Sequence, residues 1–353
     1  MKLSLRKTML SLMMAIIAVT AFGAVGVPVL PALAVGLGAS FVPMPGGVLK
    51  AGIQKEIWID DIVGNLFKSN PHLAYAMNAD SFVLAGKVVH IPNAGSKPRV
   101  VRNRKSYPAT VVHRNDTDIT FALDEFTSDP IKISNAEKYE ESPQKRQSVI
   151  GEQSNSLSEE VGDWFFYYWA QNMGIDNIHF TTGGATSAHT EGATGNRKAV
   201  TVKDVKAMQK HMNKMGIPAA GRVAHLDADM YDQFTDSLSI TQERDFSKYL
   251  DAEKGIVGRL FGFTFLEPRP SILSLNSSGV VKEPDAKGAT GDLAASLFWQ
   301  QDQVLRALGN NEFFETENDA THYGDIYSAL VRAGGRAKRA DSKGVLILAG
   351  DAS

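Results

Sequence analysis

The sequence predicts an α+β protein in which an extended β-hairpin leads into one long helix. Two runs alternate apolar and polar residues, at 81–91 and 110–126, and they flank a basic segment with prolines. Such alternation is typical of half-buried strands. A third segment, 143–173, has apolar residues mostly four apart, which is typical of a helix. A hairpin followed by a long helix suits a protein that holds its neighbours better than it suits a small enzyme.

The N-terminal segment, residues 1–50, is the most biased part of the chain. Lys2, Arg6 and Lys7 precede a run without another charged residue until Lys50. A basic start, an apolar stretch and small residues are the pattern of a secretory signal peptide or an N-terminal membrane anchor. The alternative is an apolar arm buried between subunits. Four prolines between residues 28 and 45 argue against one continuous spanning helix in the second half.

Residues 51–80 are predicted to be helical with breaks, and residues 81–132 to form the hairpin. Asn70-Pro71 starts a second short helical piece. The hairpin has its tip at 93–107, where prolines keep the chain out of a central sheet. Asp129-Pro130 ends the return strand, and the sequence IKIS predicts a short strand or turn.

The long helix begins with Ser142 as its N-cap and Pro143 at its first position. If it runs unbroken to Met173, it has about 31 residues and a length of roughly 46 Å. Its first half is polar with one thin apolar stripe, whereas its end, WFFYYW, is aromatic all round. We expect this end to be buried. The alternative is a stacking surface for bases or sugars.

The second half of the chain predicts an α/β lobe. A flexible Gly/Ser/Thr loop at 181–195 marks its boundary. Thr201 and Asp204 form a box-like cap for a helix that Gly216 ends. A strand at 222–226 precedes a helix capped by Asp227, and Thr241 starts a further helix through Leu250. Residues 293–308 fit either a helix or a strand followed by a shorter helix. The tail predicts a strand, a Gly-Gly turn and a closing strand at 344–350.

Composition excludes several chemistries. The 353 residues carry a net charge of −2 and no cysteine, so disulfides, thiol nucleophiles and Cys-ligated metals are ruled out. No P-loop, nucleophile elbow or His-Glu-x-x-His motif occurs. His179, His189 and Glu191 match no standard metal spacing, and the aspartates after His225 lack the Gly and Glu of a calcium loop. We therefore expect no catalytic site, no cofactor, no metal and no small-molecule substrate.

The hairpin carries opposite charges on its two limbs. Because a hairpin with one basic and one acidic limb can pair with another copy, we expect these residues to form intersubunit ion pairs. Phosphate binding by the basic limb and a plain solvated surface are the alternatives. The candidate contacts are Lys97, Arg99, Arg102, Arg104, Lys105, Asp116, Asp118, Asp124 and Glu125.

The order of these parts resembles the major capsid proteins of tailed bacteriophages, which have the Hong Kong 97-type fold. GKVVHIPNAGSKPRVV with YPATVV resembles the extended loop of that family, and residues 143–173 stand where its spine helix stands. TVKDVKAMQKHMNKMGIP with RVAHLDADMYDQF, and the tail THYGDIYSALVRAGGRAKRADSKGVLIL, resemble its later elements. The likeness covers about residues 51–350 and lies in order and spacing more than in any single motif.

The resemblance implies a structural role. Copies of the chain would form pentamers and hexamers of an icosahedral shell around double-stranded DNA, which the chain contacts non-specifically. The extended loop would lie over a neighbouring subunit. Portal, scaffolding and decoration proteins are implied as partners, and the implied location is the virion, assembled in the host cytoplasm. The implied divisions are an N-terminal arm or signal at 1–50, a helical region at 51–80, the extended loop at 81–132, the spine helix and start of the peripheral domain at 133–220, the axial domain with part of the peripheral domain at 221–310, and the closing peripheral strands at 311–353.

Three other functions remain open from the sequence. The apolar start favours a secreted or periplasmic binding protein. The fold of the resembled family also builds encapsulin-like nanocompartment shells. A hydrolase would use His225 with Asp227 or Asp229.

Overall fold

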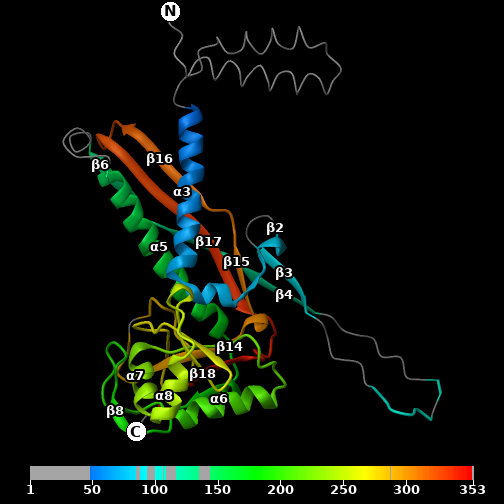
Figure 1. The fold of residues 1–353 in the computed structure, drawn as a ribbon. Coiled ribbons are helices and arrows are strands. Elements are labelled where there is room, and N and C mark those ends of the chain that lie inside the picture. Colours follow the sequence, from blue (N-terminus) through cyan, green and yellow to red (C-terminus); the bar gives the residue numbers. More distant parts are fainter. Residues whose placement is uncertain are drawn as a thin grey trace, which may run out of the picture. The chain divides into compact units, whose positions relative to one another are not determined.

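The computed structural model describes residues 48–84, 88–93, 100–105, 107–108, 117–134, 144–286 and 288–351 (Figure 1). The chain divides into two units, Met1–Ile57 and Trp58–Ser353. The signal-like segment lies outside the described residues. Among those that are described, no helix combines the length and apolar character needed to cross a bilayer.

Helix α5 (Gln144–Ala170), the part of helix α3 (Val48–Ser69) from Trp58 onward and a six-stranded sheet form one part of the second unit. Helix α3 continues into the 3-10 turn η1 (Pro71–Tyr75), and α5 lies along the long strand β17 (Gly324–Ala337) (Figure 1). The sheet runs in the order β1 (Met77–Asn78), β15 (Val304–Leu308), β17 and β16 (Glu312–Asp319). Strands β5 (Asp124–Thr127) and β6 (Ile131–Ser134) also pair with β17.

A seven-stranded sheet forms the centre of the α/β lobe. Its order is β11 (Ile256–Leu260), β12 (Phe263–Leu266), β10 (Arg222–His225), β14 (Leu293–Gln300), β18 (Val345–Ala349) and β7 (Ile178–Phe180), and β13 (Leu273–Leu275) pairs with β14. Three helices accompany it, α6 (Val202–Lys214), α7 (Ala228–Asp236) and α8 (Ile240–Ser247). Two small sheets complete the fold: β2 (Val83–Leu84), β3 (Val88–Asn93) and β4 (Thr117–Ala122), and the pair β8 (Ala185–Ser187) and β9 (Asn196–Lys198).

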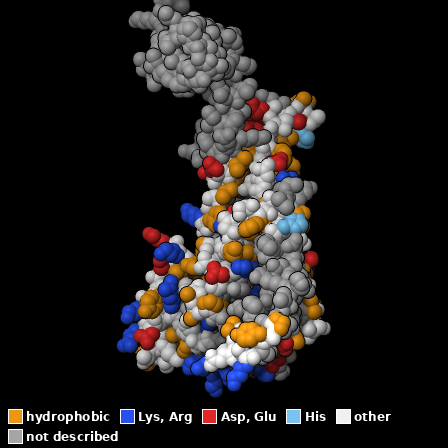
Figure 2. All heavy atoms as spheres, turned by 90° about the vertical axis from the view of Figure 1, so that its right-hand side faces the viewer, with side chains coloured by type: hydrophobic (Ala, Val, Ile, Leu, Met, Phe, Trp, Pro, Cys, Tyr) orange, Lys and Arg blue, Asp and Glu red, His pale blue; other side chains and the backbone are white. Residues whose placement is uncertain are grey.

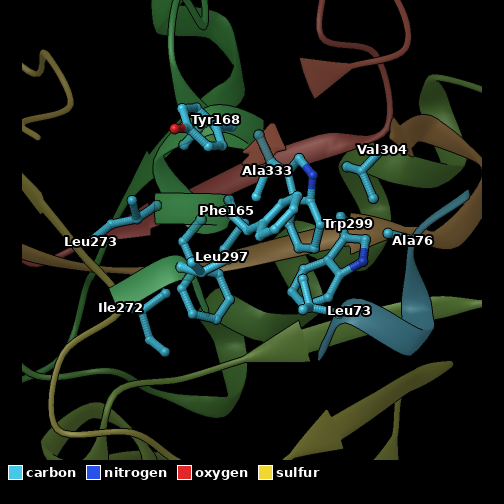
Figure 3. Packing of buried hydrophobic residues seen from close by; sticks show 14 of the residues in the cluster. Leu73, Ala76, Phe165, Tyr168, Ile272, Leu273, Leu297, Trp299, Val304 and Ala333 are labelled. Carbon is cyan, nitrogen blue, oxygen red and sulfur yellow. The ribbon is translucent and has the colours of Figure 1, made fainter. Parts of the chain in front are cut away.

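The seven-stranded sheet is buried on both faces. Leu297 and Trp299 of β14 join the core around α5. Phe298, between them, joins a second core with Met208 of α6 and Phe234 of α7. Alternate residues of one strand therefore belong to different cores, as the period of two requires. Figure 3 shows the first core, where Phe165 of α5 gathers with Leu297, Trp299 and Leu73.

The main sequence predictions for the elements are confirmed. Strands β3 and β4 pair antiparallel, with His90 opposite Thr120. The long helix is present as α5, which is 27 residues long and ends at Ala170, three residues before the predicted Met173. Its predicted N-cap Ser142 and Pro143 lie outside the described residues. Asp204 accepts a bond from the backbone of Thr201 at 2.8 Å, and the Met230 amide donates to Asp227 Oδ1 at 2.7 Å. The α+β class follows from these elements.

Three local predictions are wrong. The expected Gly-Gly turn at 334–335 lies inside β17, near its end, and the strand continues to Ala337. A Cβ on Gly334 would lie 2.9 Å from the Ala122 carbonyl oxygen, so glycine serves here to let β4 approach. The possible helix after residue 300 is instead strand β15. Helix α8 is capped by Ser239, not Thr241.

Candidate assembly elements

The extended hairpin is fixed to the body at its root. Ala79, Val89 and Leu123 form a small buried cluster with Leu305 and Ala307 of β15. The Arg336 guanidinium donates to the Thr120 carbonyl at 3.0 Å. The base of the hairpin therefore packs on the six-stranded sheet through apolar contacts and through the hydrogen bond from the Arg336 side chain to the backbone of β4.

The two acidic candidates at the end of the hairpin have partners in their own chain. The Tyr168 hydroxyl donates to Asp124. Burial is the main cause that raises the pKa of Tyr168, and this hydrogen bond is the second. Arg332 Nε donates to Glu125 Oε1 at 3.0 Å, and Arg332 Nη1 lies 3.4 Å from Glu312 Oε1. Asp124 and Glu125 thus fasten strand β5 to α5 and β17.

The basic limb is described in part. Arg102 and Lys105 are exposed and Arg104 is half-buried. None of them forms an ion pair with another described residue.

The other candidates on the hairpin are described less fully. Lys97, Arg99 and Asp116 lie outside the described residues. Asp118 stands opposite Pro92 in the hairpin register, but its side chain is not described. The intersubunit pairing of the two limbs remains a prediction.

The aromatic end of α5 is mostly core. Phe165, Phe166 and Trp169 are fully buried, and Trp169 Nε1 donates to the Leu305 carbonyl at 2.9 Å. Trp164 and Tyr167 are half-buried. Burial of the block is confirmed, and it leaves three of its rings with no surface on which a base could stack.

A set of buried and half-buried polar side chains connects η1, α5 and the α/β lobe. We call it the polar joint, and it consists of Asn70, His72, Asp163, His225 and Arg269. Arg269 Nη1 donates to Asn70 Oδ1 at 2.8 Å and Nη2 lies 3.0 Å from Asp163 Oδ1. Asn70 Nδ2 in turn donates to the Ser158 carbonyl at 2.7 Å. The guanidinium therefore bridges the end of α3 to the middle of α5.

The two histidines of the joint are neutral. Burial lowers the pKa of His225 to about 3 and that of His72 well below its ordinary value. His72 Nε2 lies 3.1 Å from the Gly162 carbonyl, and His225 Nε2 lies 2.9 Å from the Glu267 carbonyl. Because a carbonyl oxygen only accepts, both Nε2 atoms carry the proton. Burial also raises the pKa of Asp163, which the Arg269 charge opposes.

This geometry contradicts a hydrolase centred on His225. The residue is 2% exposed, so a substrate has no access to its ring. Asp227 caps α7 and lies 3.0 Å from His189 Nε2, and Asp229 is on the exposed face of α7.

The histidines in and beside the 181–195 loop do not form a metal centre. His179 contacts His211, with 2.6 Å between their ring nitrogens, while His189 pairs with Asp227. Within the described residues, no group of three or more His, Cys, Asp or Glu side chains is placed to hold a metal ion. A cavity of about 320 Å³ beside His189 has Lys282 in its wall, and this lysine pairs with Asp292 at 2.6 Å.

Sequence reasoning missed the contacts that join distant segments. Arg332 and Arg269 were not singled out, although each holds two elements together. Their partners are far away in sequence, with Asn70 lying 199 residues before Arg269. The only available signal was the cationic side chain itself, which has no period or motif.

The fold can be compared with known proteins at this point. No family model matches the sequence, and no curated protein matches it. Solved structures do match. The capsid of Ralstonia phage GP4 aligns with a TM-score of 0.54 at 13% identity, over 79% of this chain and 87% of that one.

Two further capsids align over similar lengths. The capsid of cyanophage P-SCSP1u gives a TM-score of 0.52 at 16% identity, over 79% of this chain and 87% of that one. The head of Helicobacter pylori bacteriophage KHP40 gives 0.51 at 12% identity, over 80% and 90%. At these identities the likeness concerns the fold. The described chain therefore has the fold of tailed-phage major capsid proteins, the Hong Kong 97-like fold.

Proposed function

We propose that this chain is the structural subunit of a bacteriophage capsid. Copies assemble into pentamers and hexamers, and these close into an icosahedral shell around double-stranded DNA. The observation that carries the proposal is the match to phage capsids along most of both chains, 79% of this one and 87% of the Ralstonia phage capsid chain.

The geometry of the chain supports a structural role. The hairpin is anchored at its root by the apolar cluster around Leu305. The buried histidines of the polar joint cannot exchange protons with a substrate. A shell subunit uses long elements on its borders and needs no catalytic site. We accordingly propose that the chain is not an enzyme and acts in the virion after assembly in the host cytoplasm. Its proposed partners are itself, packaged DNA, and portal, scaffolding and decoration proteins.

We further propose that the hairpin limbs pair between subunits. Asp124 and Glu125 already have partners in their own chain. The acidic side of the contact is therefore best tested at Asp116 and Asp118. The basic side is Lys97, Arg99, Arg102, Arg104 and Lys105.

The proposal is tested by examining the purified full chain with size-exclusion chromatography, light scattering and electron microscopy. We expect capsomers or closed shells. A strictly monomeric, compact species at all protein and salt concentrations contradicts the proposal. The intact mass of the chain recovered from particles then shows whether residues 1–48 are retained or removed, which separates an assembly arm from a cleaved signal.

A further inference from the structure

Helix α6 presents one row of lysines to solvent. Lys203, Lys206, Lys210 and Lys214 are all exposed, and we call them the lysine stripe. At 3.6 residues per turn they fall within an arc of about 80° and extend over about 16 Å of the helix. The opposite side of α6 carries the buried residues Val205, Met208 and Met212.

The lysine stripe is not neutralised within the described chain. None of its members forms an ion pair with another described residue. The one acidic residue of α6, Asp204, is buried and bonded to Thr201 and Thr182. Lys206 lies over the Phe261 ring, 5.0 Å from its centre, so at least one of these side chains is held by an aromatic face.

Helix α7 presents a matching row of the opposite sign. Asp229, Asp232 and Asp236 are exposed, and we call them the aspartate stripe. Their spacing of three and four residues puts them within an arc of about 60° over about 10 Å. Met230 and Phe234 are buried on the other side of α7. These aspartates likewise form no ion pair with another described residue.

Both stripes belong to the same layer of the α/β lobe. Helices α6, α7 and α8 share the second core of the seven-stranded sheet. Phe234 of α7 stacks on Phe265 of β12, with ring centres 5.1 Å apart. His211 of α6 contacts His179 of β7, at the far edge of the same sheet. Figure 1 shows α6 and α7 as separate helices in this lobe, and Figure 2 shows Lys and Arg side chains gathered at the lower end, the level of α6.

This layer carries positive charges in one row and negative charges in another. Such an arrangement favours another copy of this chain, and not DNA, as the partner. A surface that binds the DNA backbone gains from positive charge throughout, and the aspartate stripe would be repelled by phosphates. A second copy offers aspartates to the lysines and lysines to the aspartates.

We propose that the lysine stripe of one copy docks against the aspartate stripe of the next copy. The contact presupposes assembly and so rests on the proposed function. Three aspartates over about 10 Å can face three of the four lysines along α6. Each copy then leaves its other stripe free for a further copy, which makes the contact head-to-tail. Such contacts close into rings when the rotation between neighbours allows it.

Charge exchange between the stripes tests this contact. The lysine-reversed chain carries Lys203→Glu, Lys206→Glu and Lys210→Glu, and the aspartate-reversed chain carries Asp229→Lys, Asp232→Lys and Asp236→Lys. Assembly is measured as the yield of capsomers and shells by sedimentation and electron microscopy. Circular dichroism and the melting temperature check that each chain is folded. A control chain with Lys68→Glu, Lys132→Glu and Lys248→Glu makes the same change in net charge at three other exposed lysines.

We expect each reversed chain to lose at least tenfold in yield, and a chain carrying all six substitutions to recover to within about threefold of wild type. The control chain should assemble like wild type. Each reversed chain carries the same sign of charge on both stripes, so it can dock only with the other reversed chain. An equal mixture must therefore alternate around a ring, which requires an even number of subunits. It should form hexamers but not pentamers.

Three results overturn the proposal. Wild type that never assembles overturns it together with the proposed function. Reversed chains that assemble like wild type overturn the contact alone and leave the proposed function in place. Reversed chains that fail, with no recovery in the six-fold variant, also overturn the contact. In that last case, weaker binding of the lysine-reversed chain to a 30-base-pair duplex identifies DNA as the partner of α6.

Discussion

In the polar joint, Arg269 and Asp163 pair inside one chain, whereas the lysines of α6 and the aspartates of α7 form no ion pair with another described residue. The two regions also differ in burial: the histidines of the joint are fully buried, and the stripe residues are exposed. The charged pair of the joint is only partly exposed, with 19% of the Arg269 side chain and 42% of the Asp163 side chain open to solvent. The more buried charge, the Arg269 guanidinium, needs a partner within the fold, because an unpaired buried charge is expensive to desolvate. An exposed charge is solvated by water, so it costs little free energy to leave it without a partner in its own chain. Charge in the joint therefore serves folding, and charge on α6 and α7 is free for the contact between copies that we propose.

The largest effect is expected in the core next to the joint. Replacing Trp169 with alanine should lower the free energy of unfolding by about 3–5 kcal/mol, because a fully buried aromatic ring is lost. Urea denaturation followed by circular dichroism measures the loss. Trp164→Ala, the same substitution at a half-buried position of α5, should have a clearly smaller effect. Equal effects would mean that the end of α5 is not packed as described.

Acid should destabilise the joint through His225. Its pKa is about 3 in the folded chain against an ordinary value of 6.5, so between these values the unfolded chain binds a proton that the folded chain does not. Stability must then fall as pH drops from about 6.5, by at most about 1.4 kcal/mol per pH unit for this group. Comparing the pH profile of unfolding for wild type and His225→Gln measures the difference. The pKa of His72 is lowered as well. Because His72 is present in both chains, its contribution cancels in the comparison. Parallel profiles would contradict the prediction.

Adding a methyl group at Gly162 should lower the free energy of unfolding, because the methyl group would collide with Asn70. A Cβ on Gly162 would lie 2.0 Å from Asn70 Oδ1. Gly162→Ala must therefore displace Asn70 and disturb its bonds to Arg269 and Ser158. We expect a loss of about 1–3 kcal/mol in the free energy of unfolding.

The matched control is in the same helix. A Cβ on Gly151 meets nothing within 4 Å, so Gly151→Ala should stabilise α5 by up to about 1 kcal/mol. If both substitutions change stability by the same sign and amount, the close approach of Asn70 to Gly162 is refuted.

The pair formed by His189 and Asp227 should have the opposite pH dependence to His225. The bond to Asp227 raises the pKa of His189, although burial works against it. Its stabilisation is fully present below the unfolded value of about 6.5 and disappears as pH rises through the higher folded value. Unfolding of His189→Gln should therefore differ from wild type at pH 6, by up to about 1 kcal/mol, and converge with it at pH 9. A difference that grows with pH would reverse the sign and exclude the pair.

The smallest effect on folding is expected at the hairpin. Arg102→Glu, Arg104→Glu and Lys105→Glu together should change the free energy of unfolding by less than about 0.5 kcal/mol per site. The same chain should nevertheless assemble poorly if the limbs pair between subunits. Thermal melts and shell yields measured on one preparation decide this. Equal losses of folding and assembly would refute the intersubunit role.

The sequence predicted the elements whose signals are local. The hairpin strands alternate, Asp227 caps the helix that follows it, and Thr201 with Asp204 marks the start of α6. Strand β14 was ambiguous because all of its residues are buried. A strand covered on both faces has no polar alternation and cannot be distinguished from a short buried helix by its period.

Contacts between distant segments were beyond sequence reasoning. One example is the contact of Asn70 with Arg269 and with Gly162. It forms only when the end of α3, helix α5 and the segment after β12 pack together. The lysine stripe differs from these. Its spacing of three and four residues is a local signal that the sequence contains, but the buried face with Val205, Met208 and Met212 is the part of that signal that predicted the helix.

Strand β14 also restricts motion inside the subunit. Neighbouring side chains of β14 and β18 enter different cores, so the sheet is a partition common to both. Phe298 packs with residues of α6 and α7, whereas Leu297 and Trp299 pack with α5. A shift of these helices relative to α5 would therefore displace side chains of β14. In the proposed shell, a change of curvature would therefore turn each α/β lobe together with α5 as one stiff piece. The strain of such a change would collect at the borders between copies and in the connections to the hairpin.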